Sequence, residues 1–119
     1  NTNWDTLFKR LKGSLSHEAC CRFQENPLPV LINSYKRNYF INRDHTIRIT
    51  IDTGLKVFDQ RYSSSPNLTR KAILPSLVIL ELKFSEEKRE QVSQVFRDMP
   101  VSMSRNSKYV FGVRGIRGD

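Results

Sequence analysis

The chain has 119 residues, 38% of them hydrophobic, and its twenty Lys and Arg against twelve Asp and Glu give a formal net charge of +8. This length suits one domain with one modest core and excludes a large multidomain protein. The positive charge favours polyanionic partners, such as nucleic acid, anionic lipid or phosphate chains, without choosing among them. The first residue is Asn1, and a helical pattern begins at once, which indicates a single-domain fragment of a longer protein.

Several classes of protein are disfavoured by what the chain lacks. Its uncharged runs, such as 72–80, are far shorter than the roughly 20 apolar residues of a spanning helix, so we expect no membrane span in this fragment. Adjacent Cys20 and Cys21 are poorly placed to bridge each other. His17 and His45 lack the paired spacing of structural zinc sites. These features favour a reducing, cytoplasmic compartment and leave open whether the parent protein is attached to a membrane.

An amphipathic helix is predicted at the N-terminus, where apolar side chains recur at helical spacing: Trp4, Leu7, Phe8 and Leu11. Thr2 is a candidate N-cap, with Asp5 three residues later, and Gly13 is a candidate end. A second short helix is predicted around 17–23. Residues 1–29 are therefore interpreted as a helical lead-in.

Two strands joined by a turn are predicted next, because β-branched and aromatic residues begin at Val30 and a polar cluster follows at 42–44. The second strand, 47–52, alternates strictly, with three isoleucines on one face and Arg48, Thr50 and Asp52 on the other. Gly54 is predicted to turn the chain into a further strand. The polar, proline-broken segment 63–71 is predicted to be an exposed, mobile loop.

The strongest strand pattern is 77–84, whose alternation separates two sets of side chains: Leu80, Leu82 and Phe84 on one face, and Ile79, Glu81 and Lys83 on the other. A helix at about 86–99 should follow, with an apolar stripe that packs on the first set: Val92, Val95, Phe96 and Met99. A last strand is predicted over 108–113. Since the strands of 30–113 arrive through turns, the class is α+β with an antiparallel or mixed sheet.

Three predicted strands each place a basic residue beside other polar groups: Arg37 between Tyr35 and Tyr39, Arg48 beside Thr50, and Lys83 beside Glu81. In a curved antiparallel sheet they would line a cationic groove, and arginine matches phosphate oxygens well. Alternatively, these charges form an ordinary solvated face. A carboxylate in the most apolar strand must be paired or hold a metal, so Glu81 is either a metal ligand or one half of an ion pair.

Three segments resemble the vacuolar transporter chaperone (VTC) domain. The run YKRNYFINRDHTIRITIDTGL is similar to its Tyr-x-Arg strand and its Arg-hydrophobic-polar-hydrophobic-Asp strand. LELKF resembles its strand with a glutamate two residues before a lysine, and SRNSKYVFG resembles its closing segment. The resemblance runs over about 30–112, in the same order and at similar spacing, and is therefore more specific than any one motif.

The resemblance implies a triphosphate tunnel of the CYTH-like superfamily, a closed antiparallel barrel with flanking helices. Such a barrel binds ATP or another nucleoside triphosphate together with inorganic polyphosphate, and passes the γ-phosphoryl group to the chain. The chain covers about the C-terminal half of that barrel, so we expect the fragment alone to be inactive. A homo-oligomer could complete the sheet.

Site residues follow from the same resemblance, residue by residue. It implies phosphate binding by six residues: Arg37, Arg48, Lys83, Arg105, Ser107 and Lys108. Arg105 stands where the family often has lysine, and the role of Lys83 is the least clear of the six. Glu81 corresponds to a carboxylate that binds a divalent metal, Mn or Mg. Phosphoryl transfer needs positioning and charge neutralisation rather than a nucleophilic side chain, so the lack of a Ser-His-Asp constellation does not exclude an enzyme.

Other functions remain open at this point. A regulatory module could bind polyphosphate or triphosphate without turnover. A triphosphatase or cyclase of the same superfamily would need a glutamate-rich first strand, which this chain lacks. A single-stranded nucleic acid binder would place aromatic and basic residues on an exposed sheet, as Tyr35, Arg37 and Tyr39 loosely do. No sequence-specific nucleic acid partner is expected.

Overall fold

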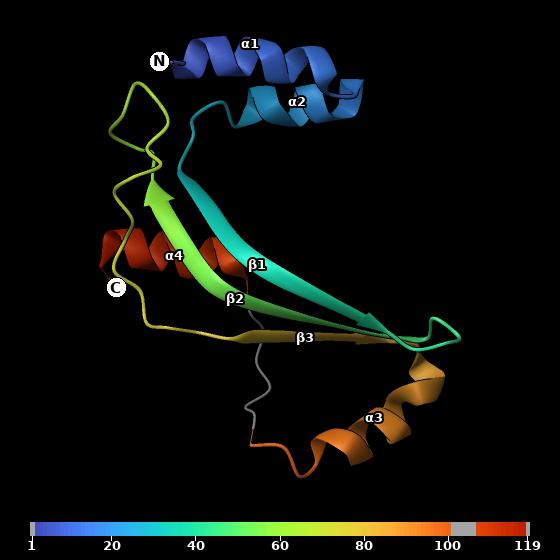
Figure 1. Ribbon diagram of the computed structural model, residues 1–119. Coiled ribbons are helices and arrows are strands. Elements are labelled where there is room, and N and C mark those ends of the chain that lie inside the picture. Colours follow the sequence, from blue (N-terminus) through green and yellow to red (C-terminus); the bar gives the residue numbers. More distant parts are fainter. Residues whose placement is uncertain (1, 101–106, 119) are drawn as a thin grey trace. The chain divides into compact units, whose positions relative to one another are not determined.

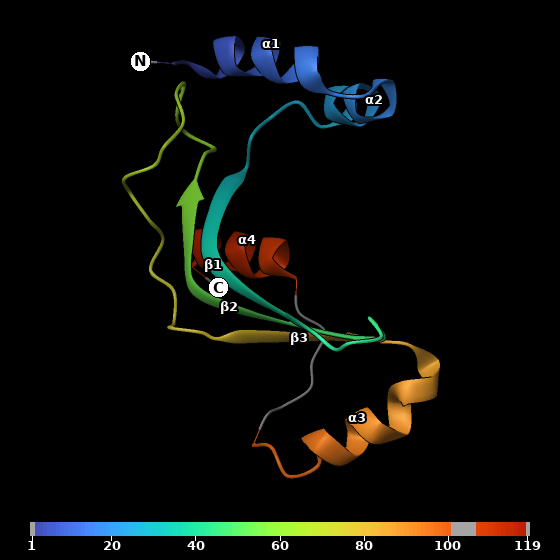
Figure 2. The same ribbon diagram turned by 45° about the vertical axis from the view of Figure 1, so that its right-hand side comes forward.

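The structure is a computed structural model that describes residues 2–100 and 107–118 (Figure 1). Its elements are α1 (Trp4–Ser14), α2 (His17–Glu25), β1 (Leu31–Ile41), β2 (Ile47–Asp59), β3 (Ile79–Phe84), the 3-10 helix η1 (Glu86–Lys88), α3 (Arg89–Phe96) and α4 (Lys108–Arg117). The strands form one antiparallel sheet in the order β1-β2-β3 (Figures 1 and 2). The predicted α+β class, with a partial antiparallel sheet and flanking helices, is confirmed.

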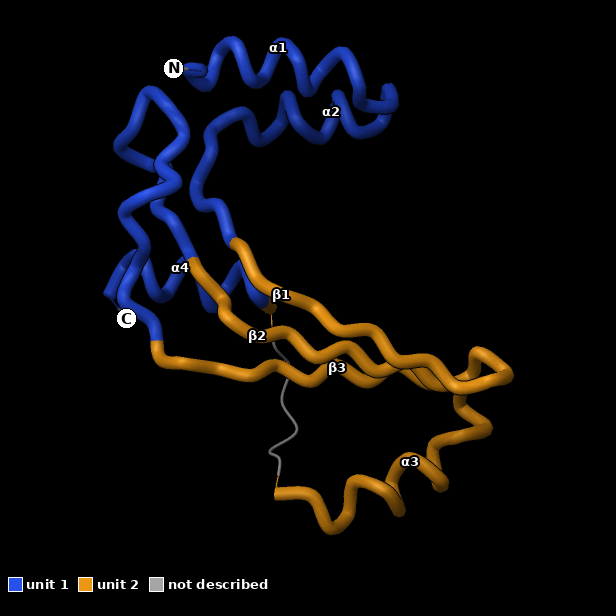
Figure 3. Tube along the Cα trace, in the orientation of Figure 1, with its two compact units in different colours: residues 1–33, 57–74, 108–119 blue, residues 34–56, 75–107 orange. Residues whose placement is uncertain are grey.

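The chain forms two compact units (Figure 3). Unit 1 consists of Asn1–Asn33, Val57–Leu74 and Lys108–Asp119, and therefore holds α1, α2, the loop after β2, and α4. Unit 2 consists of Ser34–Lys56 and Pro75–Ser107, and holds most of β1 and β2 together with β3 and α3. In the part of the chain that the structure describes, no helix combines the length and apolar content of a membrane span.

The two N-terminal helices of unit 1 were predicted correctly, but the cap of α1 was not. Asn3, rather than Thr2, is the N-cap, and its side-chain oxygen accepts a hydrogen bond of 2.9 Å from the Thr6 backbone N–H. An N-cap side chain must reach the amide two or three positions on, and only the residue directly before the helix does so. The helices contact each other through Phe8 and Phe23, whose ring centroids lie 5.0 Å apart.

Strand β2 continues through the position where a turn was predicted. Gly54 has a φ of 63° and lies inside the strand. Glycine adopts this left-handed backbone conformation without steric cost, so the strand passes through a local irregularity and runs on to Asp59. The segment predicted as a separate strand is thus the second half of β2, and it supplies the buried side chains of Val57 and Phe58.

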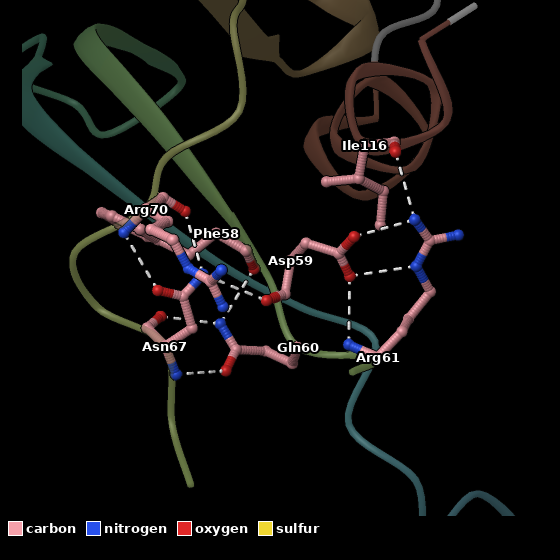
Figure 4. A network of polar contacts seen from close by, with 7 residues as sticks. All are labelled: Phe58, Asp59, Gln60, Arg61, Asn67, Arg70 and Ile116. Carbon is pink, nitrogen blue, oxygen red and sulfur yellow. Dashed lines mark hydrogen bonds and ion pairs between the residues drawn. The ribbon is translucent and has the colours of Figure 1, made fainter. Parts of the chain in front are cut away.

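The loop after β2 is anchored by amide hydrogen bonds (Figure 4). The buried Gln60 side chain donates to the carbonyls of Phe58 at 2.9 Å and Asn67 at 2.8 Å, and it accepts from the Asn67 backbone N–H at 2.8 Å. The Asn67 side chain in turn donates to the carbonyls of Asp59 and Arg70. Because these two amides find partners, the segment 63–71, which was predicted to be an exposed, mobile loop, is tied to the end of β2, and several of its residues are half-buried: Ser63, Ser65, Pro66 and Asn67.

Helix α3 is shorter than predicted, because its expected first turn is the 3-10 helix η1 and it ends at Phe96. Met99 therefore lies beyond the helix. Of the predicted apolar stripe only Val92 is buried, while Val95 and Met99 are exposed, as is Leu80 of β3. The prediction that the whole stripe packs on the apolar face of β3 is wrong in this structure.

The last element is the helix α4, where a strand was predicted over 108–113. Its β-branched and aromatic residues suggested a strand, but the less exposed positions include a helical series: Lys108, Phe111, Gly112, Gly115 and Ile116. Gly112 is buried, and a Cβ added there would lie 3.0 Å from Leu31 Cδ2 and 3.4 Å from both Val57 methyl groups. Glycine thus allows α4 to approach the ends of the strands in unit 1.

Replacing Gly112 by valine should lower the free energy of unfolding by about 1–3 kcal/mol, because the added methyl groups overpack the contact with Leu31 and Val57. Gly13→Val in α1 is the matched control, since a Cβ there meets nothing within 4 Å. It should be neutral or slightly stabilising, because valine is the better helix former. Urea denaturation measures both variants, and equal losses would contradict the close approach of α4.

Candidate functional site

The register between β2 and β3 gathers polar side chains on one face of the sheet in unit 2. Three pairs lie directly opposite each other: Arg48 and Lys83, Thr50 and Glu81, Asp52 and Ile79. The alternate pairs are apolar and occupy the other face: Ile47 and Phe84, Ile49 and Leu82, Ile51 and Leu80. The motifs predict that Arg37, Arg48, Glu81 and Lys108 share one polar face, and the register confirms this for Arg48 and Glu81.

Arg37 of β1 joins this face through a bidentate ion pair with Asp52. Its Nε lies 2.6 Å from Asp52 Oδ1, and its Nη2 lies 2.7 Å from Oδ2. The Asp52 side chain is only 1% exposed, and the hydrogen bonds that it accepts raise the pKa of Arg37. The guanidinium carbon also lies 5.1 Å from the ring centroid of Tyr35 and 5.7 Å from that of Tyr39. The orientation of Arg37 is thus fixed before any ligand binds.

We call the residues gathered here the polar face: Arg37, Tyr39, Arg48, Thr50, Asp52, Glu81 and Lys83. Lys83 Nζ lies 3.5 Å from Glu81 Oε1, and the two side chains are 68% and 43% exposed. An ion pair so open to water contributes little stability, and an incoming anion can replace it easily. Glu81 is therefore one half of an ion pair, the alternative left open by the sequence, although its partner lies on the same strand.

Arg48 differs from the other two cations of the polar face. It is exposed, and it makes no ion pair within the described part of the chain. Since Asp52 compensates Arg37 and Glu81 compensates Lys83, Arg48 carries the one uncompensated positive charge among these five groups. It is the cation most available to a phosphate ligand.

A small cavity of about 60 Å³ opens on the polar face, lined by Arg37, Tyr39, Arg48, Thr50, Glu81 and Lys83. Thr50 is 6% exposed, and its buried Oγ1 has no hydrogen-bond partner among residues 2–100 and 107–118. Sequence reasoning recognised Thr50 and Asp52 as polar but gave neither a role. The available signal was the strict alternation of β2, which places both on the face that carries Arg48.

The other predicted site residues are Arg105, Ser107 and Lys108 of the closing segment. Ser107 is exposed and directly precedes α4, and Lys108 is the first residue of α4 and belongs to the other unit. Their phosphate contacts stay a prediction. Arg105 lies outside the described residues.

The polar face offers few ligands for a metal ion. In the described ranges, no group of three or more His, Cys, Asp or Glu could hold one. Glu81 supplies one carboxylate at the cavity. Mg²⁺ is often held by one or two carboxylates together with substrate phosphates. This carboxylate therefore fits a divalent cation shared with a phosphate ligand, and does not fit a cage built by the protein alone.

Comparison with known proteins agrees with the motifs on these strands. No curated protein and no solved structure matches the chain. The VTC domain matches residues 4–116, which is nearly the whole chain and includes the Arg37, Arg48 and Glu81 motifs of the polar face. The chain therefore belongs to the VTC domain family.

Proposed function

We propose that the polar face binds the phosphate groups of inorganic polyphosphate or of a nucleoside triphosphate such as ATP. In the complete domain, we propose that it helps transfer the γ-phosphoryl group to a polyphosphate chain. The observation that carries this proposal is the register that places Arg48 opposite Lys83, on the face that Arg37 joins through Asp52. Membership of the VTC family supports the same ligand class.

Each cation has a distinct part in this proposal. Arg48 presents an uncompensated guanidinium, which can bond two phosphate oxygens at once. Arg37 is held by Asp52 through its Nε and Nη2, and it lines the same cavity as Arg48 and Lys83. Lys83 can exchange Glu81 for a phosphate oxygen, since their pair is exposed. Together, these three cations would hold successive phosphates and neutralise their charge.

A divalent cation fits this proposal at Glu81. Bound there, it would neutralise charge that develops on phosphate oxygens during transfer. The residues of this chain bind and orient the anion, and the alternative of a binding module without turnover uses the same contacts. Metal-dependent release of pyrophosphate or phosphate from a nucleotide separates the two functions.

Replacing Arg48 by alanine should weaken the binding of tripolyphosphate about tenfold to a hundredfold, because one direct charge-assisted contact is lost. Isothermal titration calorimetry on the complete protein measures the change. Binding to the unaltered protein should also weaken as salt rises, since the attraction is between a polyanion and fixed cations. Arg97→Ala is the control, because it removes the same charge from the exposed end of α3, outside the cavity.

Two results would contradict the proposal. If Arg48→Ala and Arg97→Ala lost equal affinity for tripolyphosphate, the binding would depend on net charge alone. A random-sequence oligonucleotide could instead bind more tightly than tripolyphosphate at equal charge and physiological salt. That result would favour a nucleic acid binder, in which the bases of the oligonucleotide stack on Tyr35 and Tyr39.

A further inference from the structure

Thr50 is the one polar side chain of the cavity whose hydrogen-bonding capacity is unused and sealed from water. It is 6% exposed, and its Oγ1 finds no partner in the described parts of the chain. A buried hydroxyl without a partner costs free energy, and valine would fill the same space without that cost. The fold of unit 2 therefore gains nothing from this hydroxyl in the state without ligand.

The surroundings of Thr50 indicate what could use the hydroxyl. It lies between Arg48 and Asp52 along β2 and directly opposite Glu81, and it lines the cavity that the three cations also line. Asp52 is engaged by Arg37, and Glu81 lies 3.5 Å from Lys83. The cavity is thus rich in donors, and an oxygen-rich anion would supply the acceptor that the Thr50 hydroxyl lacks.

We propose that the Thr50 hydroxyl donates a hydrogen bond to a phosphate oxygen of the ligand bound on the polar face. This inference rests on the proposed function and adds a neutral contact to the three cations. Tyr39, Glu81 and Lys83, which also line the cavity, are 69%, 43% and 68% exposed and are therefore far more open to water than Thr50. In this proposal, the phosphate reaches the buried hydroxyl when these exposed side chains move aside.

The contact also makes the site more selective. Lysine and arginine attract any polyanion, whereas a single hydroxyl at the floor of a small cavity requires an acceptor oxygen at a defined position. A tetrahedral phosphate can place one oxygen at the floor and others on the cations. A planar carboxylate has only two oxygens and cannot satisfy as many of these donors at once.

The test separates binding from stability. Thr50→Val keeps the shape and the strand propensity but removes the hydroxyl. We expect its affinity for tripolyphosphate to fall about tenfold or more in calorimetry, because a hydrogen bond to a charged acceptor is lost. Its Tm should stay equal to that of the unaltered protein or rise. Thr50→Ser, which keeps the hydroxyl, should retain most of the affinity, and Thr53→Val on the same strand, outside the cavity, should leave it unchanged.

The possible failures are distinct. If the unaltered protein does not bind tripolyphosphate, the proposed function fails, and this inference fails with it. If the unaltered protein binds and Thr50→Val binds equally well, only the role of Thr50 is overturned. A fall in both affinity and Tm for Thr50→Val would also overturn it, because the hydroxyl would then have a structural partner.

Discussion

Replacing Arg37 by alanine should lower the Tm of the protein by roughly 10 °C or more, whereas Arg48→Ala should leave the Tm nearly unchanged. The reason is the 1% exposed carboxylate of Asp52, which loses its bidentate guanidinium partner. Removing one half of a buried ion pair leaves a charge that the interior solvates poorly. Arg48 is exposed and pairs with no buried carboxylate among the described residues. Differential scanning calorimetry of both variants measures the contrast.

A double variant makes the cause specific. Asp52→Ala combined with Arg37→Ala should recover part of the lost Tm, because no buried charge then remains. Equal effects of Arg37→Ala and Arg48→Ala would contradict the pairing. The pairing would also be contradicted if the fall in Tm of the double variant equalled the sum of the falls of the two single variants, because the effects of independent sites add.

The polar face could be predicted because strand periodicity is a matter of geometry. Side chains alternate along any strand, so the segments around Arg48 and Glu81 each divide into an apolar and a polar set. The apolar sets are expected to share one side of the sheet, which brings the polar sets together on the other side, and the register shows this division. The sequence therefore predicts which side chains share the face without knowledge of the exact register.

The pairing of Arg37 with Asp52 could not be predicted in the same way. It depends on the register between β1 and β2, and the sequence offers both Asp52 and Glu81 as partners for the cations. The orphaned hydroxyl of Thr50 is likewise invisible, because the sequence does not show which polar atoms find partners. The sequence thus predicts which residues lie on the polar face, but not which of them pair with each other and which remain available to a ligand.

The errors in the predicted fold have a common cause: the local sequence allows more than one secondary structure, and tertiary packing decides between them. Gly54 can end a strand or allow an irregularity within it, and only the continuation of β2 decides between them. The short run 108–113 has strand-forming residues, yet it folds as the start of α4. The decisive feature is the close contact at Gly112, which involves Leu31 and Val57, residues far away in the sequence.

Replacing Glu81 by glutamine should separate turnover from binding. If the protein transfers phosphoryl groups, metal-dependent turnover should fall roughly a hundredfold or more, because a divalent cation is worth several kcal/mol of charge stabilisation and glutamine binds it poorly. Binding of tripolyphosphate without metal should persist or tighten. The variant removes a negative charge from the cavity and frees Lys83, which lies 3.5 Å from Glu81 in the unaltered protein.

The matched control for that variant is Glu87→Gln, which makes the same chemical change in η1, outside the cavity. Both variants are measured in two assays: calorimetry with tripolyphosphate, with and without manganese, and phosphate or pyrophosphate release from ATP. Glu87→Gln should leave both readouts unchanged. Unchanged turnover in Glu81→Gln would exclude Glu81 as the group that holds the cation. Weaker metal-free binding would show that the Glu81 carboxylate orients Lys83 toward the ligand. In the proposal, the carboxylate instead competes with the ligand for Lys83.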